Sequence, residues 1–333
     1  MRAKHIVAIA CAGAFLTLTP CAAAQTYTVT SVSNTDLGTI AAAANGTTVF
    51  TVDASTGVVT KKSGNGARIS ATTTRSLITI SCNTPGNCSN DTPKITIAPT
   101  GSPTNRANSL TNFTLSVTGA TATIVTQPGT GNSITATLAA IPKGLSRTIY
   151  VGLDATYSGD NSPAATGPAN ANFVVTVTTN SGSGATTSTG LVTATVFRTL
   201  TITNGTLLSF GRISRPLSGA GTVSLPAGAA SVAVTGNGVV AIASPAPSSA
   251  ILTANGEGGQ ALTISVPSSF TMANGASTLT VTTQAINTGA QTLTGTIGNT
   301  GSKTVTVGGS FPITSTTALG AYSGNFTVTF QYN

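Results

Sequence analysis

The stretch GAYSGNFTVTFQYN, residues 320–333, shows the pattern that decides the fold of this chain. Five apolar side chains fall on every second position, with Gly324 in the same series: Tyr322, Phe326, Val328, Phe330 and Tyr332. Successive side chains of a β-strand point to opposite faces, so this alternation predicts a strand with one buried face. Comparable runs occur upstream, such as NANFVVTVTTN at residues 170–180. The alternation therefore predicts a protein built from strands.

The composition indicates the same class of fold. Charged residues make up only 6% of the chain and glycine accounts for 37 of its 333 residues, while Thr, Ser, Val and Ala are abundant, which favours strands and turns over helices. Asn-Gly pairs suit tight hairpin turns, because both residues tolerate positive φ. The pairs lie at residues 45–46, 65–66, 204–205, 237–238, 255–256 and 274–275. We expect an all-β chain of immunoglobulin-like sandwiches.

The N-terminus has the features of a secretory signal peptide. Arg2 and Lys4 precede an apolar run at residues 6–18, and residues 22–24 are alanines that offer a cleavage site. The run is too short to span a bilayer as a helix, so we expect residues 1–24 to be removed on export and no transmembrane segment to remain. Lipid attachment at Cys21 is the minor alternative, because Pro20 stands where a lipoprotein signal needs a small residue.

Two cysteines remain after the leader, Cys82 and Cys88, around the loop CNTPGNC. The Pro-Gly turn can bring the two sulfurs together, and export to an oxidising compartment favours a disulfide between them. A metal site is the rival interpretation, but the mature chain has no histidine and no further cysteine to complete one. We therefore predict a disulfide and no metal.

Two similar halves flank the Gly- and Ser-rich stretch at residues 181–190, which has the composition of a flexible linker. DLGTI at residues 36–40 corresponds to SFGRI at 209–213, and NANFVVTVTTN corresponds to the final strand SGNFTVTFQYN at 323–333. We predict two tandem sandwich domains, at residues 25–185 and 186–333. Residues 191–202 could belong to either copy.

The second half resembles an uncharacterised family of secreted bacterial domains that is similar to spore coat protein U-type subunits of archaic chaperone-usher pili. The motifs that carry the resemblance are LLSFGRI at residues 207–213, GTVSL at 221–225, VTVGGSFPI at 305–313 and the final strand. In the first half the match is looser, because residues 151–153 read Val-Gly-Leu where the second half has VGG.

This resemblance implies a role for the final strand. Pilins of the chaperone-usher class end in an alternating strand with a penultimate tyrosine and a glycine about a dozen residues earlier, which Tyr332 and Gly320 match. A periplasmic chaperone grips such a strand by strand addition, which needs an accessible edge and pockets at every second residue. The candidate strand-pairing residues are Gly320, Tyr322, Phe326, Val328, Phe330 and Tyr332. An ordinary last strand of a closed sandwich would show the same alternation.

Catalysis is not expected. A serine nucleophile has no histidine in the mature chain to activate it, and GEGG at residues 256–259 lacks the lysine and helix of a phosphate loop. The nearest carboxylate pair, Asp154 and Asp160, lies in a stretch that is a weak candidate for acid–base chemistry or calcium binding. The sequence predicts no catalytic, cofactor-binding or metal-binding residue.

The charge distribution gives little information about partners. With two of the 14 basic residues in the leader, the mature chain has a net charge of +6, spread mostly as single residues without aromatic neighbours. This pattern predicts a solvated surface and no nucleic-acid site. An acidic polysaccharide or another surface receptor remains open.

Two hypotheses follow. In the first, the protein is a fimbrial subunit or two-domain tip adhesin at the cell surface, with a periplasmic chaperone, an outer-membrane usher and neighbouring pilus subunits as partners. In the second, it is a free-standing secreted or surface-layer-type sandwich without a fibre partner. An incomplete sandwich, with an open apolar groove in the monomer, would favour the first hypothesis.

Overall fold

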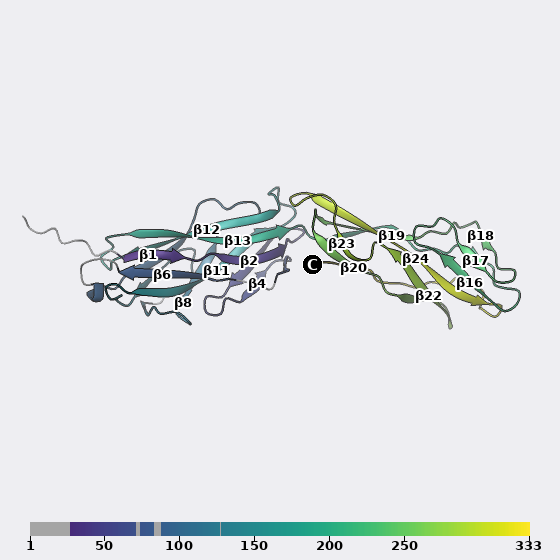
Figure 1. Ribbon diagram of the computed structural model, residues 1–333, viewed down its shortest axis with the longest axis horizontal. Helices are drawn as coiled ribbons and strands as arrows, with labels where there is room; N and C mark the ends of the chain where they lie inside the picture. Colours follow the sequence, from purple (N-terminus) through teal and green to yellow (C-terminus); the bar gives the residue numbers. More distant parts are fainter. Residues whose placement is uncertain (1–26, 71–73, 83–87, 127) are drawn as a thin grey trace, which may run out of the picture.

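The computed structural model describes residues 27–333 apart from 71–73, 83–87 and 127. Its regular structure consists of strands and, within these residues, one short 3-10 helix, η1 (Cys88–Asn90). The prediction of an all-β chain is confirmed. Figure 1 shows an elongated molecule in which the strands up to β13 lie at one end and those from β14 onward at the other. The predicted signal peptide lies outside the described residues.

The first half, residues 27–197, consists of two sheets. One has the order β1-β6-β11-β3-β4 with β8 beside β11, and the other has the order β5-β2-β13-β12-β7-β10-β9. Buried side chains from both sheets form one core, for example Ile78 and Ile149 from the first sheet with Ile95 and Phe173 from the second. The strands are β1 (Tyr27–Val32), β2 (Thr35–Ala41), β3 (Thr47–Val52), β4 (Val59–Ser63), β5 (Ala67–Arg68), β6 (Ser76–Cys82), β7 (Lys94–Thr100), β8 (Thr111–Ser116), β9 (Ile124–Thr126), β10 (Ile134–Leu138), β11 (Ser146–Ser158), β12 (Gly167–Thr178) and β13 (Thr186–Phe197).

The second half, residues 201–332, has one large sheet and two small ones. The large sheet has the order β14-β19-β24-β16-β17, with β22 beside β24 and β21 beside β22; the small sheets are β15-β18 and β23-β20-β25. Its strands are β14 (Thr201–Thr206), β15 (Arg212–Ile213), β16 (Ala220–Leu225), β17 (Ala233–Thr235), β18 (Ala241–Ile242), β19 (Ala250–Glu257), β20 (Ala261–Ser265), β21 (Ser269–Asn274), β22 (Ser277–Ile286), β23 (Gly289–Thr292), β24 (Thr300–Thr314) and β25 (Thr329–Tyr332).

The longest strand of each half changes partner at a glycine. β11 pairs with β6 up to Val151 and with β3 from Leu153, and β24 pairs with β19 up to Val307 and with β16 from Gly309. Gly152 and Gly308 lie at these crossings, where a side chain would meet backbone atoms of the neighbouring strands. The large sheet of the second half thus repeats the strand order of the first sheet of the first half.

The division between the halves differs from the predicted one. Residues 179–185, which overlap the start of the predicted linker, form the turn of a hairpin whose arms β12 and β13 pair from Val177–Thr186 to Gly167–Val196. β13 also pairs with β2, in parallel, so it belongs to the sheets of the first half. Since β14 pairs with β19, the change from one set of sheets to the other lies at residues 198–200. A run of serine and threonine resembles a linker in composition, but it also suits the start of a strand, where residues 186–189 are half-buried or exposed.

The connection at residues 198–200 is held from both sides. The backbone N–H of Arg198 donates to Glu257 of the second half (3.1 Å), and the N–H of Thr199 donates to Asp160 of the first half (2.8 Å). Two successive amides are therefore bound by carboxylates from opposite halves.

Tyr332 adds to this junction from the C-terminal strand. Its hydroxyl accepts a hydrogen bond from the N–H of Glu257 (2.7 Å) and donates one to the carbonyl of Arg198 (3.2 Å). Its ring lies 5.7 Å from that of Phe197, and the buried hydroxyl of Thr166 donates to Glu257 (2.9 Å). The penultimate residue of the chain thus contacts both halves, and Figure 1 shows the C-terminus near the middle of the molecule.

The disulfide between Cys82 and Cys88 is present, as predicted. It lies beside Tyr27, whose hydroxyl donates to the carbonyls of Cys88 (3.2 Å) and Asp91 (2.9 Å). Burial, followed by the neighbouring Asp91 carboxylate, raises the pKa of Tyr27 to about 12. The disulfide joins η1 to the end of β6, and the hydrogen bonds of Tyr27 hold η1 against the start of β1.

Three of the six Asn-Gly pairs show where the turn prediction is right and where it is wrong. Residues 274–275 lie at a tight hairpin between β21 and β22, as predicted. Residues 204–205 and 255–256 lie inside β14 and β19, so a turn was the wrong prediction there. At Gly256 the reason is packing, because a Cβ would collide with the hydroxyl of Tyr332.

Candidate functional site: an open groove beside the C-terminal segment

The predicted strand-pairing residues all lie on one segment of the second half, residues 320–332. β25 pairs antiparallel with β20, which places Phe330 opposite Ile264 and Tyr332 opposite Leu262. Nearer its start, the segment touches β21 through a single bridge between Ser323 and Ala273. The final strand is therefore built into its own half along one edge.

The alternation read from the sequence is reproduced in space. Tyr332 is buried, Phe326, Val328 and Phe330 are half-buried, and the intervening residues are exposed. The last three pack with Tyr332 against the second half's core around Leu262 and Ile264. Residues 329–332 form part of the predicted strand, and the half-buried alternation extends back to Tyr322 although residues 324–328 form no ladder.

Tyr322 and Gly320 lie at the other end of this segment. The hydroxyl of Tyr322 donates to the carbonyl of Ala318 (3.0 Å), and the side-chain amide of Asn274 donates to the carbonyl of Leu319 (3.1 Å). Gly320 has a φ of +138°, a conformation that side chains disfavour. These residues shape the turn into the segment, and Tyr322 borders both hollows described next, whereas Gly320 borders the second.

The outer edge of this segment is unpaired. Within the described part of the chain, residues 324–328 form no ladder with any strand, and β25 is the end strand of its small sheet. Across from it lies a second free edge, formed by β14 and residues 207–210. Among the described strands, these residues pair on their inner side alone, with β19 and Ser248. Two strand edges with unused backbone groups therefore face each other.

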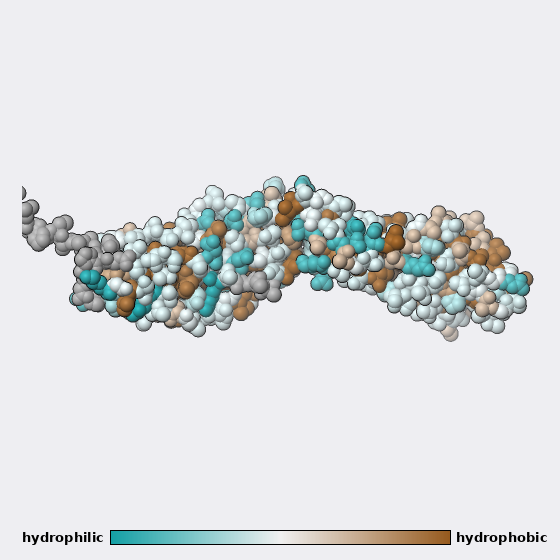
Figure 2. All heavy atoms as spheres, in the orientation of Figure 1, coloured by the Kyte–Doolittle hydropathy of each residue, from teal (hydrophilic) through white to brown (hydrophobic). Residues whose placement is uncertain are grey.

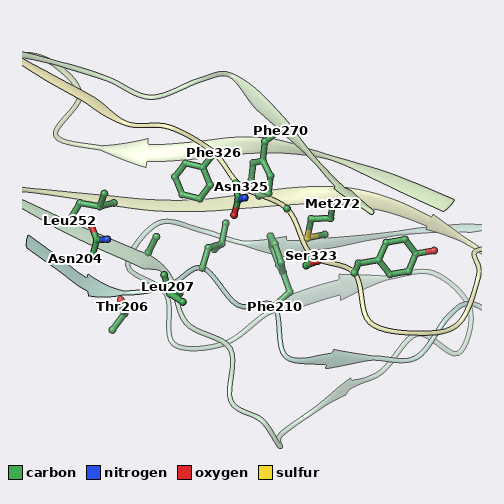
Figure 3. Close-up of a pocket in the computed structure, with 14 residues that line it drawn as sticks. Asn204, Thr206, Leu207, Phe210, Leu252, Phe270, Met272, Ser323, Asn325 and Phe326 are labelled. Atoms are coloured by element: carbon green, nitrogen blue, oxygen red, sulfur yellow. The ribbon is translucent and has the colours of Figure 1, made fainter. Parts of the chain in front are cut away.

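An open groove of about 340 Å³ lies between these two edges. One wall is formed by residues 204–210 and the other by residues 322–326, while Leu252, Phe270 and Met272 line the space between them. Figure 3 shows the rings of Phe326 and Phe270 side by side, with centroids 5.0 Å apart, and Leu207 and Phe210 on the opposite wall. The groove thus exposes apolar side chains that a closed sandwich would bury.

The groove continues toward the end of the molecule away from the junction. A second hollow of about 660 Å³ shares Leu208, Phe210, Met272 and Tyr322 with the first and extends to Phe311 and Leu319. Figure 2 shows hydrophobic surface gathering over this end of the second half. The two hollows adjoin through these shared residues, and the second is also lined by polar side chains such as Arg212, Ser214 and Thr317.

Sequence reasoning identified one wall of the groove and missed the other. Leu207 is 78% exposed and every residue of β14 is exposed, yet LLSFGRI reads like an ordinary strand of apolar residues. Alternation shows which side chains point inward, but it cannot show whether a strand has a neighbour on each side. No pattern in the sequence marks Leu252, Phe270 or Met272 as partly uncovered.

The carboxylates considered for catalysis or calcium binding have structural partners. Asp154 accepts hydrogen bonds from Lys62 and Asn112 (both 2.7 Å), and Asp160 pairs with the buried Arg106. Burial by itself raises the pKa of Asp154, but hydrogen bonds led by that from Lys62 outweigh it and lower the pKa below its usual value. No group of three or more possible metal ligands occurs among the described residues.

Among the residues that the structure describes, no helix has the length and apolar character needed to cross a membrane.

Comparisons with known proteins bear mainly on the second half. No curated protein matches the chain. One solved structure, described as a chaperone-tip adhesin complex in CFA/I fimbriae biogenesis, aligns with 90% of this chain and 96% of its own length at 10% identity and a TM-score of 0.26. Residues 200–332 match the model of a domain of unknown function, DUF4402, whose limits coincide with the second half.

Proposed function

We propose that this protein is a non-enzymatic structural or adhesive subunit of the bacterial cell surface, assembled by strand addition into the groove of its second half. The observation that carries the proposal is the groove itself, with a free strand edge on each side and apolar side chains between them. An extended segment placed there would satisfy both edges by backbone hydrogen bonds and would cover the apolar surface with alternate side chains.

The pilin-like motifs agree with this role. On that basis the partners are a periplasmic chaperone, an outer-membrane usher and neighbouring pilus subunits, and the location is a fimbrium after export through the periplasm. In the first half β13 pairs with β12 along the corresponding edge, and β1 pairs with β6. This supports a terminal position, as in a two-domain tip adhesin whose second half accepts a strand and whose first half binds a surface receptor or polysaccharide.

A charge at the groove wall tests the proposal. Leu207 is 78% exposed, so Leu207→Asp should leave the monomer folded while placing an unpaired carboxylate where the incoming strand must pack. Leu217 is 79% exposed and lies outside both hollows, so Leu217→Asp is the matched control. The measurement is the amount of each variant in the fibre fraction sheared from cells of the producing bacterium.

We expect Leu207→Asp to be lost from the fibre fraction and Leu217→Asp to be retained. Equal recovery of both variants with the unaltered protein would overturn strand addition at this groove. It would favour the second candidate function, a free-standing secreted or surface-layer-type protein without a fibre partner.

A further inference from the structure

The first half contains a strand where the second half has its groove. β12 pairs with β7 along one edge and with β13 along the other. In the second half, the segment 320–332 pairs with β20 through residues 329–332 and, among the described residues, forms no ladder along its other edge. If the two segments are equivalent, β13 is the strand that the second half lacks.

Three features establish that equivalence. Gly167 at the start of β12 has a φ of +102°, and Gly320, at the start of the other segment, has a φ of +138°. Phe173 and Phe326 each follow that glycine by six positions, in NANF and SGNF. The neighbouring strands on the other edge also correspond. Val177, four residues after Phe173, faces Ile95 of β7, and Phe330, four residues after Phe326, faces Ile264 of β20.

The opposite wall corresponds as well. β13 lies between β12 and β2, and it runs antiparallel to β12 and parallel to β2. β2 contains DLGTI, the counterpart of SFGRI at residues 209–213, which begins in the wall of the groove. Both neighbours of β13 thus have equivalents on the two sides of the open groove.

β13 presents small side chains to the core. Its buried residues alternate in the order Gly190, Val192, Ala194 and Val196, while Thr189 on the outer face is exposed. Gly190 lies opposite Phe173, and a Cβ at Gly190 would collide with the Phe173 ring. The aromatic ring therefore fills the space that a side chain at position 190 would need.

We propose that the strand accepted by the second half is supplied by a partner chain and follows the pattern of β13. This inference rests on the proposed function and adds the sequence class, direction and register of the partner. The incoming segment runs antiparallel to residues 320–332, carries glycine opposite Phe326, and carries small apolar residues at the second and fourth positions after that glycine. These face Gly324 and Tyr322, the counterparts of Ala171 and Ala169, which face Val192 and Ala194 in the first half.

Synthetic peptides with the sequence of β13 test this inference. A labelled peptide TTSTGLVTATVF, residues 186–197, is added to the purified full-length protein, and binding is followed by fluorescence anisotropy. A second peptide carries Gly190→Leu, which should clash with Phe326, and a third carries Thr189→Leu on the outward face as the matched control. We expect the Gly190→Leu peptide to bind about tenfold to a hundredfold more weakly than the other two.

Two protein variants locate the site and the register. Leu207→Asp should abolish binding of the unaltered peptide, which assigns that binding to the groove. Phe326→Ala, checked for folding by circular dichroism, should restore binding of the Gly190→Leu peptide, because the ring that excludes leucine is gone.

Equal affinity of the Gly190→Leu and unaltered peptides would overturn the register. If no peptide binds while Leu207→Asp is still lost from fibres, the β13 pattern is wrong and strand addition stands. If no peptide binds and Leu207→Asp assembles normally, both the pattern and strand addition are refuted.

Discussion

The two halves share a sheet order and differ in one strand. β1-β6-β11-β3-β4 in the first half corresponds to β14-β19-β24-β16-β17 in the second. Beside β12, however, the first half has β13, whereas the corresponding edge in the second half has no neighbour among the described strands. The presence or absence of this strand decides whether the core is closed or open to a partner. A closed half suits a stable binding module, and an open half suits assembly.

The largest effect should follow from removing β13 from the first half. Residues 25–198 expressed alone should fold, whereas residues 25–185, which end at the division predicted from the sequence, should not. The shorter fragment exposes the core that Val192, Ala194 and Val196 cover, at a cost of roughly 5 kcal/mol or more. Urea unfolding of the two fragments measures the difference, and equal stability would show that β13 does not complete the first half.

The crossing glycines test whether the two halves are built alike. Gly308→Ala places a Cβ against the carbonyl of Leu225, and Gly152→Ala places one 2.6 Å from the backbone of Val52. Each should destabilise its own half by about 3 kcal/mol, because the colliding atoms are backbone and cannot turn away. Gly129→Ala is the control, since its added Cβ meets nothing. Thermal unfolding of each variant gives the comparison. If only one of the two substitutions at the crossings were destabilising, β11 and β24 would not be equivalent.

The junction tests whether the halves unfold together. Glu257 is fully buried and accepts hydrogen bonds from Thr166, the Arg198 amide and the amide of Gly298, so Glu257→Gln should cost about 2 to 3 kcal/mol. It should also split one calorimetric transition into two by weakening the contact between the halves. Asp53→Asn is the control, because the hydrogen bonds of Asp53 stay within its own turn. A single unchanged transition would show that Glu257 does not couple them.

The disulfide should stabilise only the first half. Replacing Cys82 and Cys88 by serine removes a short closed loop, at a cost of about 2 kcal/mol by the loop-closure estimate. The second half contains no cysteine, so its unfolding should not change. Denaturation of the variant, followed by one probe in each half, checks this expectation. Free thiols measured in the exported native protein would refute the disulfide there.

Much of this comparison could be predicted from the sequence, and its decisive element could not. The period-two alternation predicted the strands, and SFGRI and the final strand predicted the repeat. The start of β13 was assigned to a linker because residues 181–190 combine a true turn with the first residues of a strand, and these residues are mostly Ser and Thr. The groove was missed because an unpaired edge depends on which strands are neighbours, a property of topology that local patterns do not encode.

The smallest expected effect concerns the response of Asp154 to acid. Asp154 lies two residues after the crossing glycine Gly152, and the equivalent residue after Gly308 in the second half is Ser310. Because hydrogen bonds from Lys62 and Asn112 help to lower the pKa of Asp154 in the folded state, this group contributes stability above its unfolded pKa. That contribution is lost as the pH falls through the lower folded pKa. Asp154→Asn should therefore cost about 1 kcal/mol at neutral pH, with the share from the half-exposed Lys62 reduced by solvent screening. The variant should also make the first half less sensitive to acid below about pH 4. Midpoints of urea unfolding, measured from neutral pH to below about pH 4, check the prediction. An unchanged dependence of the midpoint on pH would show that Asp154 and its hydrogen-bond partners do not distinguish the two halves.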